Sequence, residues 1–305
     1  MYDIIGDIHG YAGTLSRLLD RLDYRKSSGI YAHPTRKVLF VGDFIDRGPE
    51  IRQTLEIVRP MVESGSALAV LGNHELNALA YHTPRSDSPG EFLRPHTAKN
   101  EHQHSETLKQ LNQKEMQSAL AWFKSLPLWL DLPELRVVHA CWDNRCQEKV
   151  SEGLRQHGGL SDPFLHSACS PGQELYDPVE VILKGKEAKL PEGMSFTDKD
   201  GHERNDIRIR WFVDPAHQTF DSYSMTAGIG IDYPLTPGVI ETADPYPRDA
   251  KPVFFGHYWL KAERPELLAP NVACVDYSVA KGGFLCAYRW GGEQQLRNEN
   301  FVWES

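Results

Sequence analysis

Three short polar segments near the start of the chain carry side chains that can bind metal ions. They are Gly-Asp-Ile-His-Gly at residues 6–10, Gly-Asp-Phe-Ile-Asp-Arg-Gly at 42–48 and Gly-Asn-His-Glu at 72–75. Carboxylate, imidazole and amide groups are common ligands of divalent cations. Because an arginine and a second histidine stand beside these ligands, the segments point to metal-assisted phosphate chemistry.

The residues around these segments predict strands that bring them together. An aliphatic run precedes each segment, at residues 2–5, 38–41 and 68–71, and a stretch of helical character follows each one. Leucines at helical spacing between Leu15 and Leu22 predict one buried helix face. Strands that alternate with helices favour an α/β sheet, in which ligands bind at the C-terminal ends of the strands.

Two later apolar runs also end in a possible ligand. The run at residues 135–138 is followed by His139, and the run at 252–256 is followed by His257. Taken singly, a Gly-Asp pair can be a turn, a histidine can be a hydrogen-bonded core residue, and Asn73 can be a cap. Since five strand-like runs all end in a candidate ligand, we favour one common site over five unrelated turns.

Other parts of the chain predict less regular structure. Residues 83–106 are polar and rich in histidine, which favours a long solvated loop or lid over a third metal site. Residues 108–130 predict a helix that closes at Pro127. Residues 272–277 and 284–290 predict an antiparallel hairpin. Pro60 is expected to kink or end early the helix after the second segment.

Composition excludes several classes of protein. The 305 residues carry a formal charge of −9, from 33 Lys+Arg against 42 Asp+Glu, which argues against non-specific nucleic-acid binding. No apolar run approaches the roughly 18–20 residues that span a membrane. Met1 leads directly into a predicted strand, so we expect no signal peptide. Five irregularly spaced cysteines suit reduced thiols, and we expect a cytoplasmic protein.

The three opening segments, together with His139 and His257, give the chain a resemblance to the calcineurin-like metallophosphoesterases. Within that family it resembles the phosphoprotein phosphatase branch, which includes bacterial Ser/Thr phosphatases and diadenosine tetraphosphatases. The resemblance implies an α/β (α+β) fold, a four-layer α/β/β/α sandwich with an inserted cap region. We expect one domain over residues 1–305. Frequent Pro, Gly and charged residues with weak periodicity predict that residues 144–250 are an insertion over the site, a cap that selects the substrate.

The resemblance also implies a ligand set for two divalent metal ions. Manganese is the expected metal, with iron and zinc as alternatives. The first ion would be held by Asp7, His9 and Asp43, and Asp43 would be shared with the second ion. The second ion would be completed by Asn73, His139 and His257. In such a dinuclear centre a metal-bound hydroxide attacks phosphorus in line.

Further residues acquire roles through the same resemblance. Arg47 would contact phosphoryl oxygens, although a surface ion pair is the alternative. His74 would protonate the leaving oxygen, with Asp46 orienting its ring and raising its pKa, and its alternative is a plain N-terminal helix residue. A second phosphate-binding arginine is expected from the insertion. Arg208 and Arg210 are the preferred candidates.

The resulting function is a metal-dependent phosphohydrolase that cleaves phosphate esters or anhydrides. It would act on a phosphorylated small molecule, a nucleotide or a phosphoprotein. Glu75 is typical of the protein phosphatases, whereas an insertion over the metals favours a small ligand such as a bis(5'-nucleosyl) tetraphosphate. A nuclease is a further alternative, opposed by the negative charge. A non-catalytic binding protein is opposed by the presence of every expected ligand and of His74.

Overall fold

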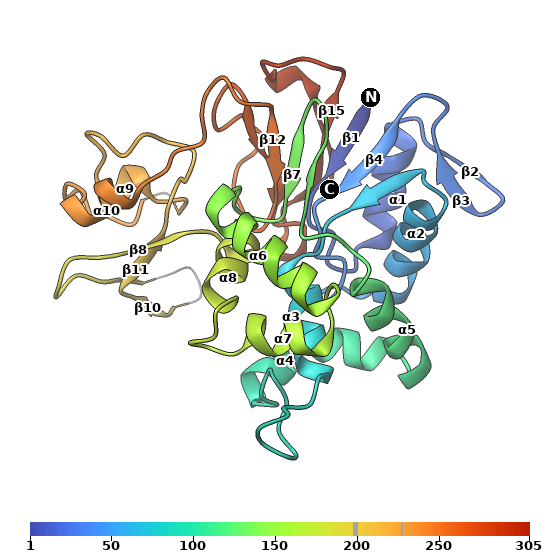
Figure 1. Ribbon diagram of the computed structural model, residues 1–305. Coiled ribbons are helices and arrows are strands. Elements are labelled where there is room, and N and C mark those ends of the chain that lie inside the picture. The colour runs from blue at the N-terminus through green and yellow to red at the C-terminus, as the bar shows by residue number, and fades with distance from the viewer. Residues whose placement is uncertain (198–200, 227) are drawn as a thin grey trace. The chain divides into compact units, whose positions relative to one another are not determined.

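The computed structural model describes residues 1–197, 201–226 and 228–305 (Figure 1). Within them the chain packs as two compact units. The larger unit comprises residues 1–183 and 251–305, and the smaller one comprises residues 184–250. All metal ligands implied by the resemblance belong to the larger unit. No helix in the described part of the chain combines the length and hydropathy needed to cross a bilayer.

A six-stranded sheet contains the three predicted opening strands. Its order is β14-β15-β1-β4-β5, and the sixth strand, β16, also pairs with β15. The three opening strands run parallel, with Ile5 opposite Phe40 and Phe40 opposite Ala69. The strand bounds are β1 (Tyr2–Ile5), β4 (Lys37–Phe40), β5 (Ala67–Ala69), β14 (Asp276–Tyr277), β15 (Phe284–Trp290) and β16 (Phe301–Glu304).

A second sheet has four strands in the order β13-β12-β7-β6. Here β12 runs parallel to both β7 and β13. The strand bounds are β6 (Trp129–Asp131), β7 (Arg136–Val138), β12 (Val253–Phe255) and β13 (Val272–Cys274).

The predicted hairpin of residues 272–277 with 284–290 is wrong in its first half. Only β14 pairs with β15, whereas β13 joins the second sheet. The Val275 amide donates to the carbonyl of Phe255 at 2.8 Å, which continues the pairing with β12 before the chain crosses over. The six residues before Ser278 therefore do not form one strand.

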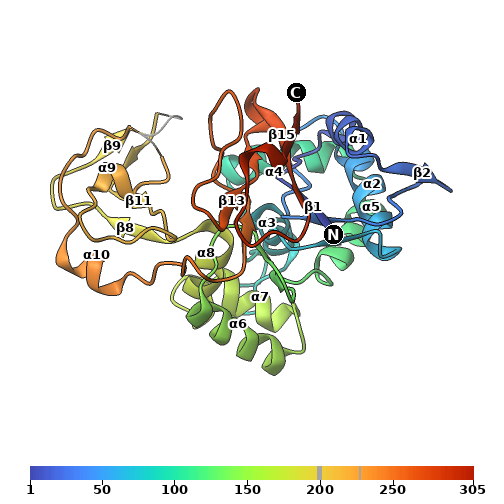
Figure 2. The same ribbon diagram turned by 90° about the horizontal axis from the view of Figure 1, so that it is seen from above.

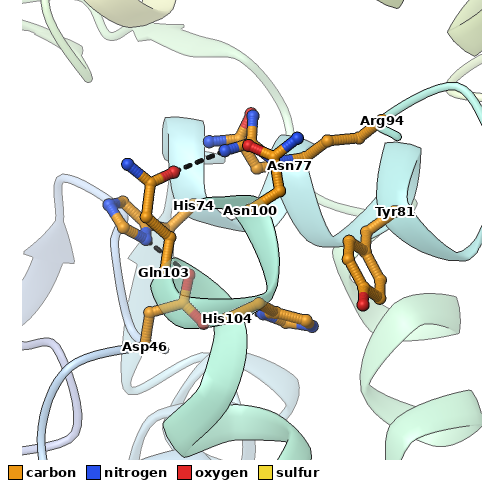
Figure 3. A pocket seen from close by; sticks show the side chains of 8 residues that line it. All are labelled: Asp46, His74, Asn77, Tyr81, Arg94, Asn100, Gln103 and His104. Atoms are coloured by element: carbon orange, nitrogen blue, oxygen red, sulfur yellow. Dashed lines mark hydrogen bonds and ion pairs between the residues drawn. The ribbon is translucent and has the colours of Figure 1, made fainter. Parts of the chain in front are cut away.

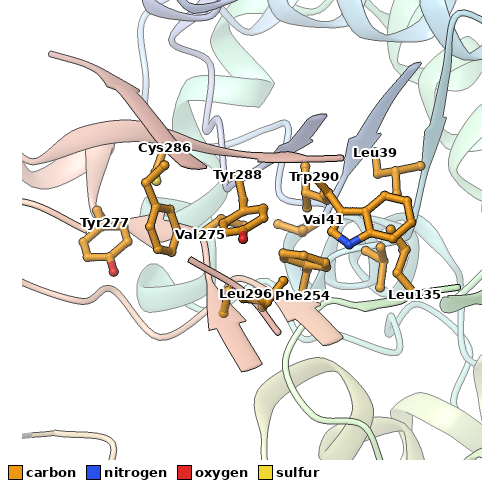
Figure 4. Packing of buried hydrophobic residues seen from close by; sticks show 14 of the residues in the cluster. Leu39, Val41, Leu135, Phe254, Val275, Tyr277, Cys286, Tyr288, Trp290 and Leu296 are labelled. Carbon is orange, nitrogen blue, oxygen red and sulfur yellow. The ribbon is translucent and has the colours of Figure 1, made fainter. Parts of the chain in front are cut away.

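Side chains from the two sheets meet in one hydrophobic core (Figure 4). Ile4 and Leu39 come from the six-stranded sheet, and Val137 and Phe254 come from the four-stranded sheet. All four are fully buried. Since alternate residues of a strand point to opposite faces, one face of each sheet is committed to this core and the other faces the helices.

Helices cover the outer faces of the two sheets. Helices α1 (Ala12–Arg21) and α2 (Ile51–Glu63) pack on the six-stranded sheet, and the predicted leucine face of α1 is buried. Helices α6 (Asn144–His157), α7 (Asp162–Cys169) and α8 (Tyr176–Lys184) lie on the opposite side (Figure 2). The predicted α/β/β/α layering is confirmed. Helix α2 continues past Pro60 instead of ending early.

Three helices follow β5, and two of them differ from the prediction. They are α3 (Asn73–His82), α4 (Ala98–Gln110) and α5 (Gln113–Phe123). The stretch predicted as a loop is therefore helical from Ala98 onward. The single helix predicted over residues 108–130 is wrong, because α4 ends at Gln110 and Asn112 caps α5. The Asn112 side chain accepts from the amides of Lys114 and Glu115, both at 3.0 Å.

The smaller unit is built from short elements. Its strands are β8 (Glu187–Lys189), β9 (Phe196–Thr197), β10 (Glu203–Arg204) and β11 (Asp206–Arg208), and its helices are α9 (Phe220–Tyr223) and α10 (Pro237–Thr242). Buried Trp211 makes edge contacts with Phe212 and Tyr246 in its core. Residues 144–183 belong to the larger unit. The single domain with a cap over residues 144–250 stays a prediction. A hairpin, β2 (Arg25–Ser27) and β3 (Ile30–Ala32), and two 3₁₀ turns, Val279–Lys281 and Asn298–Asn300, complete the larger unit.

A buried ion pair joins strands of the six-stranded sheet to the segment before β4. Arg36 Nε donates to Asp3 Oδ2 at 2.8 Å, and Arg36 Nη2 donates to the carbonyls of Tyr2 and Trp290. The Tyr24 hydroxyl donates to the same carboxylate oxygen at 2.9 Å. Asp3 is fully buried, so loss of the guanidinium leaves a charge without its main partner.

We expect Arg36→Met to lower the free energy of unfolding by about 3 kcal/mol, because the Asp3 carboxylate stays buried. Urea unfolding measures this change. Arg59→Met is the matched control, since Arg59 forms an exposed pair with Glu63 whose loss should cost about 0–1 kcal/mol. Equal effects of the two substitutions would contradict a structural role for the buried pair.

Candidate metal centre

Strands of both sheets deliver the predicted ligands to one place. Asp7 follows β1, Asp43 follows β4 and Asn73 begins α3 after β5. His139 follows β7 and His257 follows β12, so these two come from the second sheet. Two groups of buried side chains have donor atoms within 4.8 Å of one another: His9, Asp43 and His74 form one, and Asp7, Asp43 and His139 form the other.

Asp43 lies at the centre of this arrangement. Its Oδ2 is 3.6 Å from His9 Nε2 and 3.5 Å from His139 Nε2. On the second-sheet side, Asn73 Oδ1 lies 2.9 Å from His139 Nε2 and 2.8 Å from His257 Nδ1. Asp43 is thus the carboxylate common to both groups, where a shared ligand would have to lie. The assignment of each residue to a particular ion stays a prediction.

The chemistry of these donor atoms suits divalent cations. Asp7 Oδ1, His9 Nε2 and Asp43 Oδ2 are buried and have no hydrogen-bond partner among the described residues. His9 Nδ1 lies 3.0 Å from the carbonyl oxygen of Ile45, and His139 Nδ1 meets a main-chain carbonyl at 2.7 Å. A proton on Nδ1 leaves the Nε2 lone pair of each ring available for a metal ion.

The electrostatic environment favours a neutral His9 and an ionised Asp43, and it opposes ionisation of Asp7. Burial, and next the nearby His74, lower the pKa of His9 to about 3, so this imidazole is neutral. Burial alone would raise the pKa of Asp43, but neighbouring imidazoles, that of His139 first, bring it below its ordinary value. Burial, and then nearby carboxylates, raise the pKa of Asp7. A cation would remove this penalty on an ionised Asp7.

The loops that carry the site hold unusual backbone conformations. His9, Asp43, Asp46, Arg47 and His257 all have positive φ, between 49° and 72°. Non-glycine residues seldom adopt this left-handed region, and they do so mainly where the surrounding structure enforces it. The gathering of five such residues in the predicted ligand loops marks these loops as functional.

Two glycines permit close approach to the ligand carboxylates. A β-carbon on Gly72 would lie 2.2 Å from Asp43 Oδ1, and one on Gly256 would lie 2.0 Å from Asp7 Oδ1. Neither distance is possible between unbonded atoms. The glycines before Asn73 and before His257 are therefore required by space.

His74 and Asp46 form the pair that the resemblance implied. His74 Nδ1 lies 2.6 Å from Asp46 Oδ2, and the His74 amide donates to Asp43 Oδ1 at 3.0 Å. Burial by itself would lower the pKa of His74, but the carboxylates of Asp43 and Asp46 raise it above its ordinary value. The ring is held with Nδ1 toward Asp46.

His104 and Thr107 complete the surroundings of Asp46, and the sequence analysis missed both. His104 Nδ1 lies 2.7 Å from Asp46 Oδ1, so the carboxylate lies between two imidazoles (Figure 3). Thr107 Oγ1 donates to the same oxygen at 2.6 Å and accepts from the Asp46 amide at 2.9 Å. His104 is buried, contrary to the expected solvated loop. Recognition of Thr97 as a helix cap would have placed these residues on one helix face.

A small pocket beside His74 contains Arg94, which the sequence analysis also missed. Arg94 donates to Asn77 Oδ1 at 2.9 Å and to Gln103 Oε1 at 2.6 Å (Figure 3). Burial lowers its pKa. The pocket is lined by Asp46, His74, Asn77, Tyr81, Arg94, Asn100, Gln103 and His104.

Glu75 fixes the backbone around Asp43. Its carboxylate accepts from the amides of Asp43 and Phe44, both at 2.8 Å, and from the amide of Gly72 at 3.0 Å. Glu75 is fully buried, and burial first and Asp43 next raise its pKa to about 8. The side chain therefore ties the loop after β4 to the start of α3.

The predicted phosphate-binding arginines lie in different units. Arg47 is exposed at the edge of the metal-capable groups, with its guanidinium 4.1 Å from the ring centroid of Trp259. In the smaller unit, Arg208 Nε lies 3.7 Å from Glu187, and Arg210 packs against the ring of Phe212. A role of Arg208 or Arg210 in phosphate binding stays a prediction.

Comparisons with known proteins agree with this geometry. The family described as calcineurin-like phosphoesterase matches residues 2–258. An asymmetrical bis(5'-nucleosyl)-tetraphosphatase from Halalkalibacterium halodurans is 34% identical over 142 residues, 45% of this chain and 54% of the relative. A symmetrical bis(5'-nucleosyl)-tetraphosphatase from Shewanella sp. (strain MR-4) is 32% identical over 191 residues, 59% of this chain and 61% of the relative.

The matched region spans little more than half of these curated relatives. Among solved structures, a protein serine/threonine phosphatase from Saccharomyces cerevisiae is similar with a TM-score of 0.51 and 14% sequence identity. That similarity covers 99% of this chain and 78% of the other, and it concerns the fold alone.

We expect Asp43→Asn to weaken Mn²⁺ binding more than any other single substitution here, because this carboxylate belongs to both donor groups. Loss of an outer partner alone costs about 10–100-fold in metal affinity, so loss of a shared carboxylate should exceed about a hundredfold. Calorimetric titration and metal analysis of the purified protein measure this effect. Asp20→Asn, on the exposed face of α1, is the control. Unchanged metal content in the Asp43 variant would refute the shared role.

Proposed function

The chain belongs to the calcineurin-like phosphoesterases, and from its site we propose that it is a metal-dependent phosphohydrolase with a dinuclear centre. One observation carries this proposal. Asp43 is common to two buried groups of metal-capable side chains, and the Asp46–His74 pair lies directly beside it. A carboxylate between two donor groups, next to an oriented imidazole, is the arrangement that two-metal hydrolysis requires.

The proposed ligands are those that the resemblance implied, and they draw on members of both donor groups. Asp7, His9 and Asp43 would hold one ion, and the Asp43 carboxylate would also help to hold the second. Asn73, His139 and His257 would complete the second set. Two divalent cations held there would lower the pKa of bound water, so that a nucleophile forms at neutral pH, and would polarise the phosphoryl group. Neutral imidazole with carboxylate suits Mn²⁺, Fe²⁺ and Zn²⁺, of which we propose Mn²⁺.

The remaining steps belong to side chains. Arg47 would orient the phosphoryl group through the planar N–H donors of its guanidinium. His74 would donate its Nε2 proton to the leaving oxygen, since its Nδ1 is engaged by Asp46 at 2.6 Å. His104 and Thr107 hold the Asp46 carboxylate, and through it they fix the direction in which the His74 ring points.

The substrate we propose is a phosphate anhydride or ester of a small molecule or nucleotide. The names of the two relatives, both bis(5'-nucleosyl)-tetraphosphatases, support a dinucleoside polyphosphate before a phosphoprotein. Neither a nuclease nor a non-catalytic binding protein has a specific observation in its favour among the described residues. None of the five cysteines forms a disulfide within the described residues, which supports a cytoplasmic site of action.

Metal removal tests the reaction class. We expect the purified protein to hydrolyse p-nitrophenyl phosphate with added Mn²⁺, to lose this activity in a chelator, and to regain it when Mn²⁺ is returned in excess. Parallel assays with Fe²⁺ and Zn²⁺ rank the metals. Activity that is unchanged by the chelator would contradict the two-metal proposal, because the donor groups would then have no role in turnover.

Protonation of the leaving group by His74 gives a second test. We expect His74→Asn to slow hydrolysis of an alkyl phosphate more than that of p-nitrophenyl phosphate, because a good leaving group needs little protonation. His104→Leu should show the same selectivity with a loss of about tenfold, whereas His104→Asn, which keeps a donor near the Nδ1 position, should restore part of the rate.

The control for this second test lies on the same helix. His102 is exposed on α4, so His102→Leu should leave both substrates unaffected. If the His104 variants slowed good and poor leaving groups equally, the contact with Asp46 would be structural only.

A further inference from the structure

Two exposed cations meet on one aromatic ring at the edge of the proposed metal centre. The Arg47 guanidinium lies 4.1 Å from the ring centroid of Trp259, and Lys281 Nζ lies 4.6 Å from the same centroid. The ring is also close to the donor groups, with its centroid 5.6 Å from that of His9. Arg47, Trp259 and Lys281, here called the cationic rim, come from three separate segments of the larger unit.

The buried carboxylate of Asp276 holds two segments of this rim in place. Asp276 Oδ2 accepts from the amide of Trp259 at 2.6 Å, and Asp276 Oδ1 accepts from the amide of Ser278 at 3.0 Å. Trp259 and Ser278 both have positive φ, 55° and 59°, so their backbones are held in conformations that the sequence alone does not favour. Ser278 leads into the 3₁₀ turn that ends at Lys281. One side chain therefore fixes both the indole and the turn that carries the lysine.

The chemistry of the rim suits an extended anion. An aromatic ring attracts a cation through its quadrupole but carries no net charge, so it positions Arg47 and Lys281 without cancelling their charge. A phosphomonoester whose phosphoryl group is held by Arg47 and two metal ions presents no second anionic group to a more distant lysine. A polyphosphate chain presents one at each further phosphate. In a chain with a net charge of −9, two cations placed together at the site are a specific feature.

We propose that Lys281, positioned by Trp259 beside Arg47, binds the second and later phosphates of a polyphosphate chain and so favours anhydride substrates over simple monoesters. This inference rests on the proposed phosphohydrolase function and deepens it, because it assigns the substrate class to named residues. Lys281 is a specificity residue in this scheme. Trp259 is a positioning residue.

The test compares two substrates in the Mn²⁺-loaded enzyme. We expect Lys281→Gln to lower kcat/KM for diadenosine tetraphosphate by about tenfold, mostly through KM, and to change that for p-nitrophenyl phosphate by less than about twofold. Lys281→Arg should retain the preference. Trp259→Leu should also lower kcat/KM for diadenosine tetraphosphate, and because the ring contacts Arg47 as well, it should slow p-nitrophenyl phosphate too. The matched control is Lys114→Gln, an exposed lysine on α5.

A binding measurement keeps the proposal testable without turnover. Calorimetric titration with inorganic tripolyphosphate and with orthophosphate should show tighter binding of tripolyphosphate to the unmodified protein, and Lys281→Gln should reduce that difference. Equal losses on both substrates, or an unchanged tripolyphosphate preference, would overturn the subsite. If the unmodified protein lacks Mn²⁺-dependent hydrolysis, the proposed function fails. The tripolyphosphate titration still decides whether the rim binds such chains.

Discussion

The repulsion between buried carboxylates is the constraint on which this structure depends. Asp7 and Asp43 are both buried in the interior, where burial first, and then the carboxylates of Asp276 and Asp43, raise the pKa of Asp7. Two sheets must present their strand ends to the same point to bring imidazoles from β7 and β12 against carboxylates from β1 and β4. His9 and Asp43 both adopt the left-handed backbone conformation at this point, with φ of 49° and 53°.

Sequence reasoning succeeded where a ligand directly follows a strand. Asp7, Asp43, His139 and His257 each end an apolar run, so local pattern and site position coincide, and the structure brings them together as expected. It failed where contact depends on a distant helix. His104 lies 58 positions from Asp46 in the chain, and its polar neighbours resemble a loop because α4 exposes most of its surface.

Two other failures have different physical causes. The mostly apolar residues 272–277 satisfy strand preferences in either sheet, and only tertiary pairing decides that the chain crosses after Val275. The smaller unit has strands of two or three residues, too short for periodicity to register. Substrate preference was left open for a related reason, since the rim at Trp259 joins three segments that carry no common motif.

The hydrogen bonds between α4 and Asp46 have a consequence for the exchange of chain segments between related proteins. Thr107 both donates to the Asp46 side chain and accepts from its main chain, so the loop after β4 and helix α4 act as one structural unit. A chimaera that replaced residues 83–110 with a foreign lid would keep every proposed metal ligand. It would nevertheless leave the oriented imidazole unsupported. The smallest transferable module of this site therefore includes a helix that binds no metal.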